Sequence, residues 1–262
     1  MFEDYRKAPL WVPLAVTAAV GALAVGVGLG AGPDQLPTSA LAAPTARVLT
    51  LSEAAGVQHL LDQQHRTAVT EVFSFTARGQ SVAAKLSITA DRTSGYGTVG
   101  VGLADGQALL DHGNLYVRAD QQFWQALGVD DAELGTHGWV RTPPEFFDRQ
   151  LFAAPVWTAA LTPGPDARIR GALYTVRAGW AHINGISGST PGDLPDGATL
   201  MPQGRRVWID HWAVGGSEGD VVPEDPGAVG AAAAELARQL PATVRLTRNP
   251  SGAWSLASVN RR

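Results

Sequence analysis

The longest predominantly apolar stretch of the chain is Leu10–Leu29, which carries no charged side chain. At about 1.5 Å of rise per residue, a helix of about twenty residues covers the roughly 30 Å hydrocarbon core of a bilayer. Arg6 and Lys7 precede the stretch, and no further Lys or Arg occurs before Arg47. The positive-inside rule then places the N-terminus in the cytoplasm. The pattern predicts one transmembrane helix followed by an extracytoplasmic chain.

A tract rich in Pro, Gly and Ala follows, and it predicts a tether over residues 31–50. It contains the A-x-A pattern Ala40–Ala42, which is typical of signal-peptide cleavage. Because the apolar stretch is longer than the usual core of a signal peptide, we predict that the helix is retained as an anchor. Cleavage would instead release a secreted protein. The predicted domains are a cytoplasmic tip with the transmembrane helix at 1–30, the tether at 31–50, and an extracytoplasmic domain at 51–262.

From residue 69 onward the hydrophobic pattern has a period of two, which indicates half-buried strands. Short links that contain glycine or other turn residues join these segments, as in antiparallel hairpins. The first group predicts a meander with one apolar face. Its segments are 69–76, 82–89, 98–103, 108–111 and 115–119. Further strands are predicted at 169–177, 180–186, 205–212, 243–247 and 253–259.

One helix is predicted before this strand-rich region and another before its final hairpin. A modest helix covers Ser52–Arg66, with Ser52 as its N-cap. Asp225 and Pro226 are typical of a helix start, and the helix ends at Pro241. Between them the aromatic stretch Glu145–Leu161 is interrupted by proline, which favours a broken helix packed on the sheet. The fold class is therefore α+β.

Composition supports a folded, β-rich domain. Hydrophobic residues make up 45% of the 262 residues and charged residues 17%, and thirty glycines and seventeen prolines suit short strands and turns. A net charge of −4 without a basic block argues against nucleic acid as a partner. Without cysteine the chain has no disulfide, thiolate metal site, cysteine nucleophile or lipidated cysteine.

The order of residues between 93 and 139 resembles a known family. A glycine-punctuated hairpin is followed by Gly113–Arg118, Phe123-Trp124 and Gly138–Val140. This order is similar to actinobacterial envelope lipoproteins of the LprG and LppX type, which share a half-barrel fold with the periplasmic carrier LolA. The chain departs from that family because it lacks the lipidated cysteine. The resemblance implies a strongly curved antiparallel sheet wrapped around helices, with a gap that holds the acyl chains of lipids or glycolipids.

The candidate ligand-binding residues are the apolar faces of adjoining strands and the aromatic stretch that would cover them. Each methylene buried in such a cavity would contribute roughly 0.8 kcal/mol. The alternative is that the same side chains close a dry core. The predicted lining residues are Phe73, Phe75, Leu86, Ile88, Val101, Leu103, Leu115, Val117, Phe152 and Trp157.

Two glycine motifs lack the context that their chemistry requires. Gly95–Gly100 has the G-x-G-x-x-G spacing of a dinucleotide site, but residues with a period of two follow instead of a helix. Gly215–Gly219 has the G-x-S-x-G spacing of a nucleophile elbow, but a loop with two prolines follows. We predict hairpin glycines at the first motif and no nucleophile elbow at the second.

The six histidines show no metal-ligand spacing, so no metal site is predicted. His211 follows Asp210, but neighbours on a regular strand point to opposite faces, so we expect no contact between them. The sequence therefore predicts a non-enzymatic protein, without cofactor, that holds or helps transfer a lipid or other hydrophobic ligand in the cell envelope. Its partners would be the membrane, a lipid or glycolipid, and an envelope protein. The alternative is a non-catalytic envelope scaffold or interaction module with a filled core, which presents loops such as 188–204.

Overall fold

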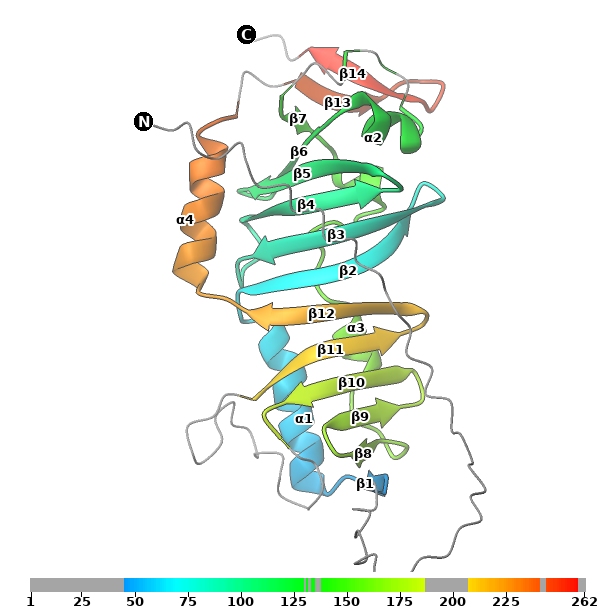
Figure 1. The fold of residues 1–262 in the computed structure, drawn as a ribbon, viewed down its shortest axis with the longest axis vertical. Coiled ribbons are helices and arrows are strands. Elements are labelled where there is room, and N and C mark those ends of the chain that lie inside the picture. Colours follow the sequence, from blue (N-terminus) through cyan, green and yellow to red (C-terminus); the bar gives the residue numbers. More distant parts are fainter. Residues whose placement is uncertain are drawn as a thin grey trace, which may run out of the picture. The chain divides into compact units, whose positions relative to one another are not determined.

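The period-two segments form strands of one large sheet (Figure 1). The computed structural model describes residues 45–129, 131, 133–134, 138–186, 207–240 and 244–258. Within them fourteen strands pair side by side. In their order across the sheet, the strands are β1 (Arg47–Val48), β8 (Arg168–Arg170), β9 (Leu173–Val176), β10 (Gly179–Asn184), β11 (Trp208–Val214), β12 (Ser217–Pro223), β2 (Val69–Ala77), β3 (Gln80–Ile88), β4 (Gly95–Val101), β5 (Ala104–Asp111), β6 (Asn114–Ala119), β7 (Val140–Arg141), β13 (Val244–Arg248) and β14 (Trp254–Ser258).

Two antiparallel meanders make up most of this sheet. The first runs from β2 to β6 through short hairpins. The second runs from β8 to β12, and all its links are short except the connection of β10 to β11, which covers residues 185–207. They join where β12 pairs with β2, which places Gly219 opposite Phe73 and Val221 opposite Glu71. All neighbouring strands are antiparallel except β7 and β13, which run parallel with Val140 opposite Val244. The sheet is therefore mixed.

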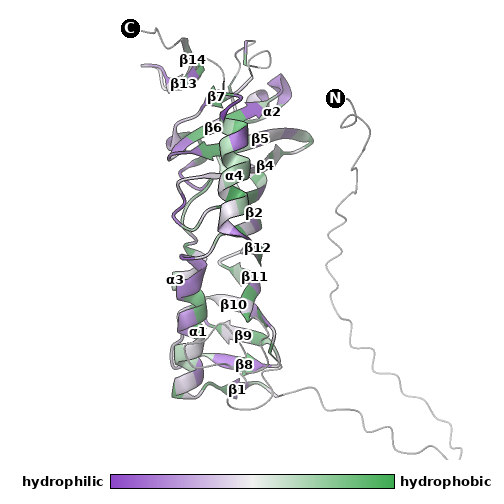
Figure 2. Cartoon of the chain, turned by 90° about the vertical axis from the view of Figure 1, so that its left-hand side faces the viewer, coloured by the Kyte–Doolittle hydropathy of each residue, from purple (hydrophilic) through white to green (hydrophobic). Residues whose placement is uncertain are grey.

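One face of the sheet, here called the core face, carries two apolar cores. Cross-strand partners share a face, and one row of partners runs across both meanders through Tyr174, Ala181, Trp212, Gly219, Phe73, Ala84 and Val99. On β2–β6 the core is covered by α2 (Gln121–Ala126) and by the 3-10 helix η1 (Pro144–Phe147). On β8–β12 it is covered by α1 (Leu51–Gln64) and α3 (Trp157–Ala160). Figure 2 shows α1 and α3 together on one side of these strands.

The opposite, outer face carries the helix α4 (Pro226–Ala237). Alternation along β5 explains this arrangement, because Ala108 and Leu110 belong to the core face while Leu109 packs with Ala233 of α4. The predicted helix start is confirmed, since Asp225 is the N-cap and its side chain accepts a hydrogen bond from the backbone N–H of Ala228. Both faces of β4 and β5 are therefore covered.

The helix α1 begins earlier than the sequence pattern predicts. Its N-cap is Thr50 rather than Ser52. Thr50 accepts from the backbone N–H of Glu53, and the Glu53 carboxylate accepts from the backbone N–H of Thr50 at 2.8 Å. This reciprocal capping box requires an acidic side chain three residues after the cap. Thr50 has that residue and Ser52 does not.

The predicted half-barrel is wrong. A half-barrel needs a curled antiparallel sheet that encloses helices on one side, whereas this sheet is open, mixed and bears helices on both faces. The physical reason is that β2 does not end the sheet. Its free edge pairs with β12, which adds the second meander.

Membrane attachment falls outside this description. In the described part of the chain, no helix is long and apolar enough to cross a membrane. The predicted span Leu10–Leu29, the Ala40–Ala42 pattern and the loop 188–204 lie outside the described residues.

Candidate functional site

The predicted lining residues fill cores. Seven of them belong to the core on β2–β6, namely Phe75, Leu86, Ile88, Val101, Leu115, Val117 and Phe152. Trp157 belongs to the core on β8–β12, and Phe73 is partly buried and packs against both cores. Leu103 is 95% exposed, so it does not face inward with the others. The period-two pattern continues to Leu103, but β4 ends at Val101 and Gly102 turns the chain with φ +62°.

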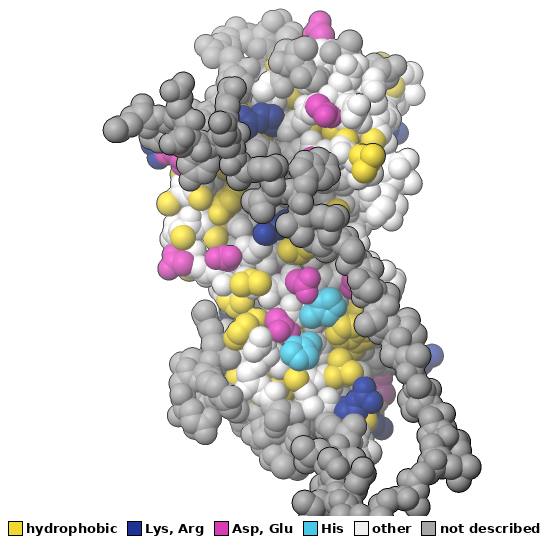
Figure 3. Space-filling model, viewed as in Figure 1, with side chains coloured by type: hydrophobic (Ala, Val, Ile, Leu, Met, Phe, Trp, Pro, Cys, Tyr) yellow, Lys and Arg dark blue, Asp and Glu magenta, His cyan; other side chains and the backbone are white. Residues whose placement is uncertain are grey.

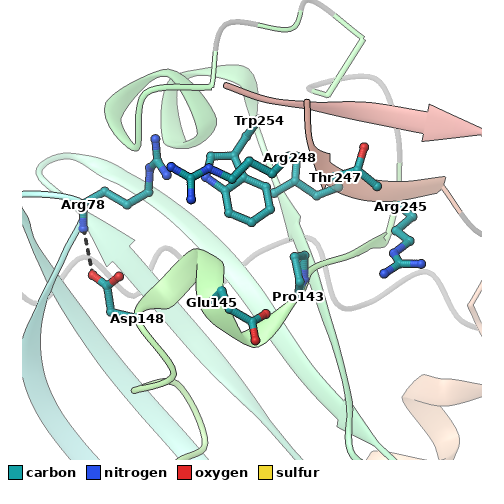
Figure 4. Close-up of a pocket in the computed structure, with 9 residues that line it drawn as sticks. Arg78, Pro143, Glu145, Asp148, Arg245, Thr247, Arg248 and Trp254 are labelled. Atoms are coloured by element: carbon teal, nitrogen blue, oxygen red, sulfur yellow. Dashed lines mark hydrogen bonds between the residues drawn. The ribbon is translucent and has the colours of Figure 1, made fainter. Parts of the chain in front are cut away.

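A pocket of about 720 Å³ opens at the far end of the sheet, beside β13 and β14 (Figure 4). We call it the arginine pocket. None of the predicted lining residues lines it. Its lining residues come from the β2–β3 turn, the segment around η1, and the final hairpin, and they are Arg78, Pro143, Glu145, Asp148, Arg245, Leu246, Thr247, Arg248 and Trp254.

Arg78 is placed by a tight hairpin turn. Arg78 and Gly79 both have positive φ, +53° and +75°, as the two central residues of a type I′ turn do. The backbone N–H of Arg78 donates to the Asp148 carboxylate at 3.2 Å. Its Nε–H donates to the carbonyl oxygen of Leu127 at 2.6 Å. The side chain is therefore held across the end of the core, while the residue stays exposed.

Two guanidinium groups meet over an aromatic wall. Arg78 and Arg248 extend toward each other from opposite sides of the pocket (Figure 4). The guanidinium carbon of Arg78 lies 5.3 Å from the ring centre of Phe146 and 5.9 Å from that of Trp254. Arg248 is fixed by a hydrogen bond from its Nε–H to the carbonyl oxygen of Gly252 at 3.0 Å. Cation–π contacts of this kind hold a guanidinium group while its N–H groups stay available.

The electrostatics of the pocket favour an anion. Partial burial lowers the pKa of Arg78 from its ordinary value; Asp148 opposes this change and the positive charge of Arg248 adds to it. Glu145 lines the pocket, but its carboxylate forms an ion pair at 2.7 Å with Arg149, which does not line the pocket. Among the described residues, no carboxylate lies within ion-pair distance of Arg78, Arg245 or Arg248. Three guanidinium groups thus line one pocket together with two carboxylates, and among the described residues none of the three is in an ion pair.

Sequence reasoning missed these residues. Arg78 lies in the short link between the predicted strands 69–76 and 82–89, and Arg248 lies 170 positions further along the chain. Their proximity depends on the parallel pairing of β13 with β7, which joins the final hairpin to the sheet. A two-residue pairing of this kind leaves no periodic signal in the sequence.

Neither glycine motif has the context that its chemistry requires, and the loop predicted after Gly219 is wrong, because the strand β12 extends to Pro223. Gly95–Gly100 lies inside β4, and a Cβ at Gly97 would approach the carbonyl oxygen of Lys85 to 2.0 Å. Gly215 and Gly216, with φ of +57° and +85°, form the turn between β11 and β12. A strand follows the turn where a nucleophile elbow would require a helix.

Comparison with known proteins gives no match to a family model, to a curated protein or to a solved structure. The resemblance to the LprG and LppX type therefore stays a prediction from the order of residues. The arginine pocket has to be interpreted from its own chemistry.

Proposed function

We propose that this protein is a membrane-tethered, extracytoplasmic binding protein without catalytic activity, and that the arginine pocket holds the anionic head group of an amphipathic ligand from the cell envelope. The observation that carries the proposal is the pair of guanidinium groups of Arg78 and Arg248, which face each other beside Trp254 and have no ion-paired carboxylate among the described residues.

The chemistry of arginine specifies the head group. Two neighbouring positive charges repel each other, and an anion between them removes that repulsion. The planar fork of N–H donors fits the oxygens of phosphate and carboxylate groups, often through two parallel hydrogen bonds. Arg245 lies on the same strand as Arg248 and supplies a third positive charge at the pocket. A phosphate or carboxylate head group is therefore the preferred ligand chemistry.

The apolar part of the pocket supports an amphipathic ligand. Pro143, Leu246 and Trp254 line the pocket beside the arginines. The cores themselves are filled, because residues such as Leu86, Val117 and Phe147 are completely buried in side-chain contacts. An acyl chain would thus contact the wall of the pocket and extend outward. A tether that holds the domain near the membrane suits a ligand whose chain stays in the bilayer.

Isothermal titration calorimetry on the full-length protein in an uncharged detergent tests the proposal. The probes are dihexanoyl phosphatidic acid, dihexanoyl phosphatidylcholine and inorganic phosphate. We expect phosphatidic acid to bind with one site per chain and more tightly than the other two. Arg245→Gln and Arg248→Gln should each weaken this binding by at least about tenfold, since one charge-assisted hydrogen bond contributes about 1.5–3 kcal/mol.

The matched control is Arg170→Gln, which removes an exposed arginine on β8 away from the pocket. This variant should bind phosphatidic acid as the wild-type protein does. Equal binding of inorganic phosphate and phosphatidic acid would show a site for a free anion and would refute the amphipathic ligand. No binding of either probe would refute the proposal and favour the interaction module with a filled core.

A further inference from the structure

A polar cluster lies on the outer face of the second meander, apart from the arginine pocket. Figure 3 shows two histidine side chains next to each other on this face, with acidic side chains beside them. His182 of β10 is directly opposite His211 of β11. Nδ1 of His182 lies 2.6 Å from Oδ1 of Asp210, and Nδ1 of His211 lies 2.6 Å from Oδ1 of Asp220. We call these four residues the histidine pair and its carboxylates.

A β-bulge brings the cluster together. The register between β10 and β11 shifts after His182, so that Ile183 pairs with Ile209 and Asp210 has no partner of its own. Ile209 and Trp212 both belong to the core face, so Asp210 and His211 both lie on the outer face. The expectation that neighbours at this point face opposite ways is wrong, because a bulge changes the alternation. Asp210 contacts His182, however, and not His211.

The carboxylates fix the orientation of both rings. The Asn184 side chain donates to Oδ2 of Asp210 at 3.0 Å, so this carboxylate is itself held in place. The ring of Trp180 packs on the ring of His211 with 5.0 Å between ring centres. An imidazole whose Nδ1–H donates to a carboxylate has its lone pair on Nε2. In the described part of the chain, neither Nε2 has a hydrogen-bond partner, and both side chains are partly exposed.

We propose that His182 and His211 together bind a first-row transition-metal dication, of the Zn²⁺, Ni²⁺ or Cu²⁺ class, through their Nε2 atoms on the outer face of β10 and β11. Directly opposite residues of an antiparallel pair have Cβ atoms about 4.5–5.5 Å apart, a spacing from which two imidazoles reach one ion. Imidazole is a preferred ligand of these metals. A ring nitrogen that donates to a carboxylate is the usual companion of a metal-ligating histidine. In this protein both histidines have such a carboxylate at Nδ1.

The site differs from a closed structural metal site. Among the described residues, no group of three or more His, Asp and Glu side chains is arranged to hold a metal ion. The two carboxylates are engaged at Nδ1 and act on the rings, not on the ion. The protein would therefore supply two ligands and leave the other coordination positions to water or to a further ligand. A site of this kind exchanges its metal readily.

Calorimetric titration of the full-length, metal-free protein with zinc chloride tests this inference. We expect one equivalent of Zn²⁺ per chain. His182→Ala and His211→Ala should each lower the affinity by at least tenfold. Asp210→Asn and Asp220→Asn should lower it by about tenfold through loss of ring orientation, as removal of such partners typically does. Circular dichroism without metal shows whether each variant keeps the fold.

The matched control is His112→Ala. His112 also lies beside a carboxylate, with Nδ1 at 2.9 Å from Asp111, but it lies in a turn outside the histidine pair. Its removal should leave the affinity and the stoichiometry unchanged. The inference is overturned if the wild-type protein takes up no equivalent of Zn²⁺, or if the double variant of His182 and His211 binds Zn²⁺ as the wild-type protein does.

Discussion

Gly219 of β12 lies where the two meanders join, and its replacement by alanine tests how they are held together. Gly219 is opposite Trp212 on one side and opposite Phe73 on the other. A Cβ at this position would lie 2.9 Å from Cζ2 of Trp212 and 2.9 Å from the carbonyl oxygen of Val72. Trp212 stacks on Trp157 with ring centres 5.1 Å apart and 11° between the planes, so its ring has little freedom to turn away.

The expected cost follows from these contacts. One close contact is with backbone and the other with a ring held on its far side, so both strands have to shift. Overpacking of this kind costs about 1–3 kcal/mol. At about 2 kcal/mol, the melting temperature of a domain of about 200 residues falls by about 4–8 °C. Differential scanning calorimetry and guanidinium unfolding followed by tryptophan fluorescence measure both quantities on the full-length protein.

A double-mutant cycle with Trp212→Leu identifies the cause. Removal of the indole relieves one of the two contacts, so Gly219→Ala should cost less in the Trp212→Leu protein than in the wild type. Two results would refute the reasoning. One is a Gly219→Ala protein as stable as the wild type, and the other is an equal cost in both backgrounds.

Three further substitutions test other parts of the fold. Glu71→Ala should lower the free energy of unfolding by about 3 kcal/mol in urea titrations, because Arg92, 3.0 Å away and largely buried, loses its carboxylate; an unchanged midpoint would contradict this. Burial, assisted by Asp166, raises the pKa of Tyr174. Because an unfolded tyrosine ionises near about pH 10, stability should fall above that pH, and calorimetry from pH 8 to 11 should show a smaller fall in Tyr174→Phe. Gly230→Ala should raise the free energy of unfolding by about 0.5–1 kcal/mol, since a Cβ there meets nothing within 4 Å and alanine favours a helix; a loss of stability would refute this.

Local structure could be predicted well from the sequence. The hairpins of the first meander follow from alternation and short turns, and the helix at Pro226 follows from its cap and its first proline. These signals depend on residues a few positions apart. The capping box of Thr50 also has a sequence signal, because Glu53 lies three residues later, so the predicted N-cap Ser52 is wrong by two residues.

The arrangement of these parts could not be predicted, because it depends on residues far apart in the chain. The sequence predicts that Phe73 and Phe75 of β2 line a cavity, yet Phe73 meets Gly219 of a strand that comes almost 150 residues later. Burial alone does not distinguish a residue that lines a cavity from one that closes a core. The lining set was chosen by apolar alternation, so it identified core residues such as Leu86 and Val117.

Both candidate sites illustrate the same limit. Arg78 lies in a turn and Arg248 at the end of a strand, and no motif links them along the chain. They come together because the final hairpin pairs with β7. His182 and His211 have no ligand spacing along the chain, because their common feature is cross-strand register. Sequence patterns report periodicity within an element. These sites depend on pairing between elements.

The register of β12 connects the fold to the histidine pair. Gly219 and Asp220 are neighbours on opposite faces of the sheet. Gly219 lies on the core face between the two cores, and the Asp220 carboxylate lies at Nδ1 of His211 on the outer face. A slip of one residue would exchange the faces of every side chain in the strand. It would place a carboxylate against Trp212, where even a Cβ is too close. The glycine that lets the cores join therefore also selects the one register in which Asp220 reaches His211.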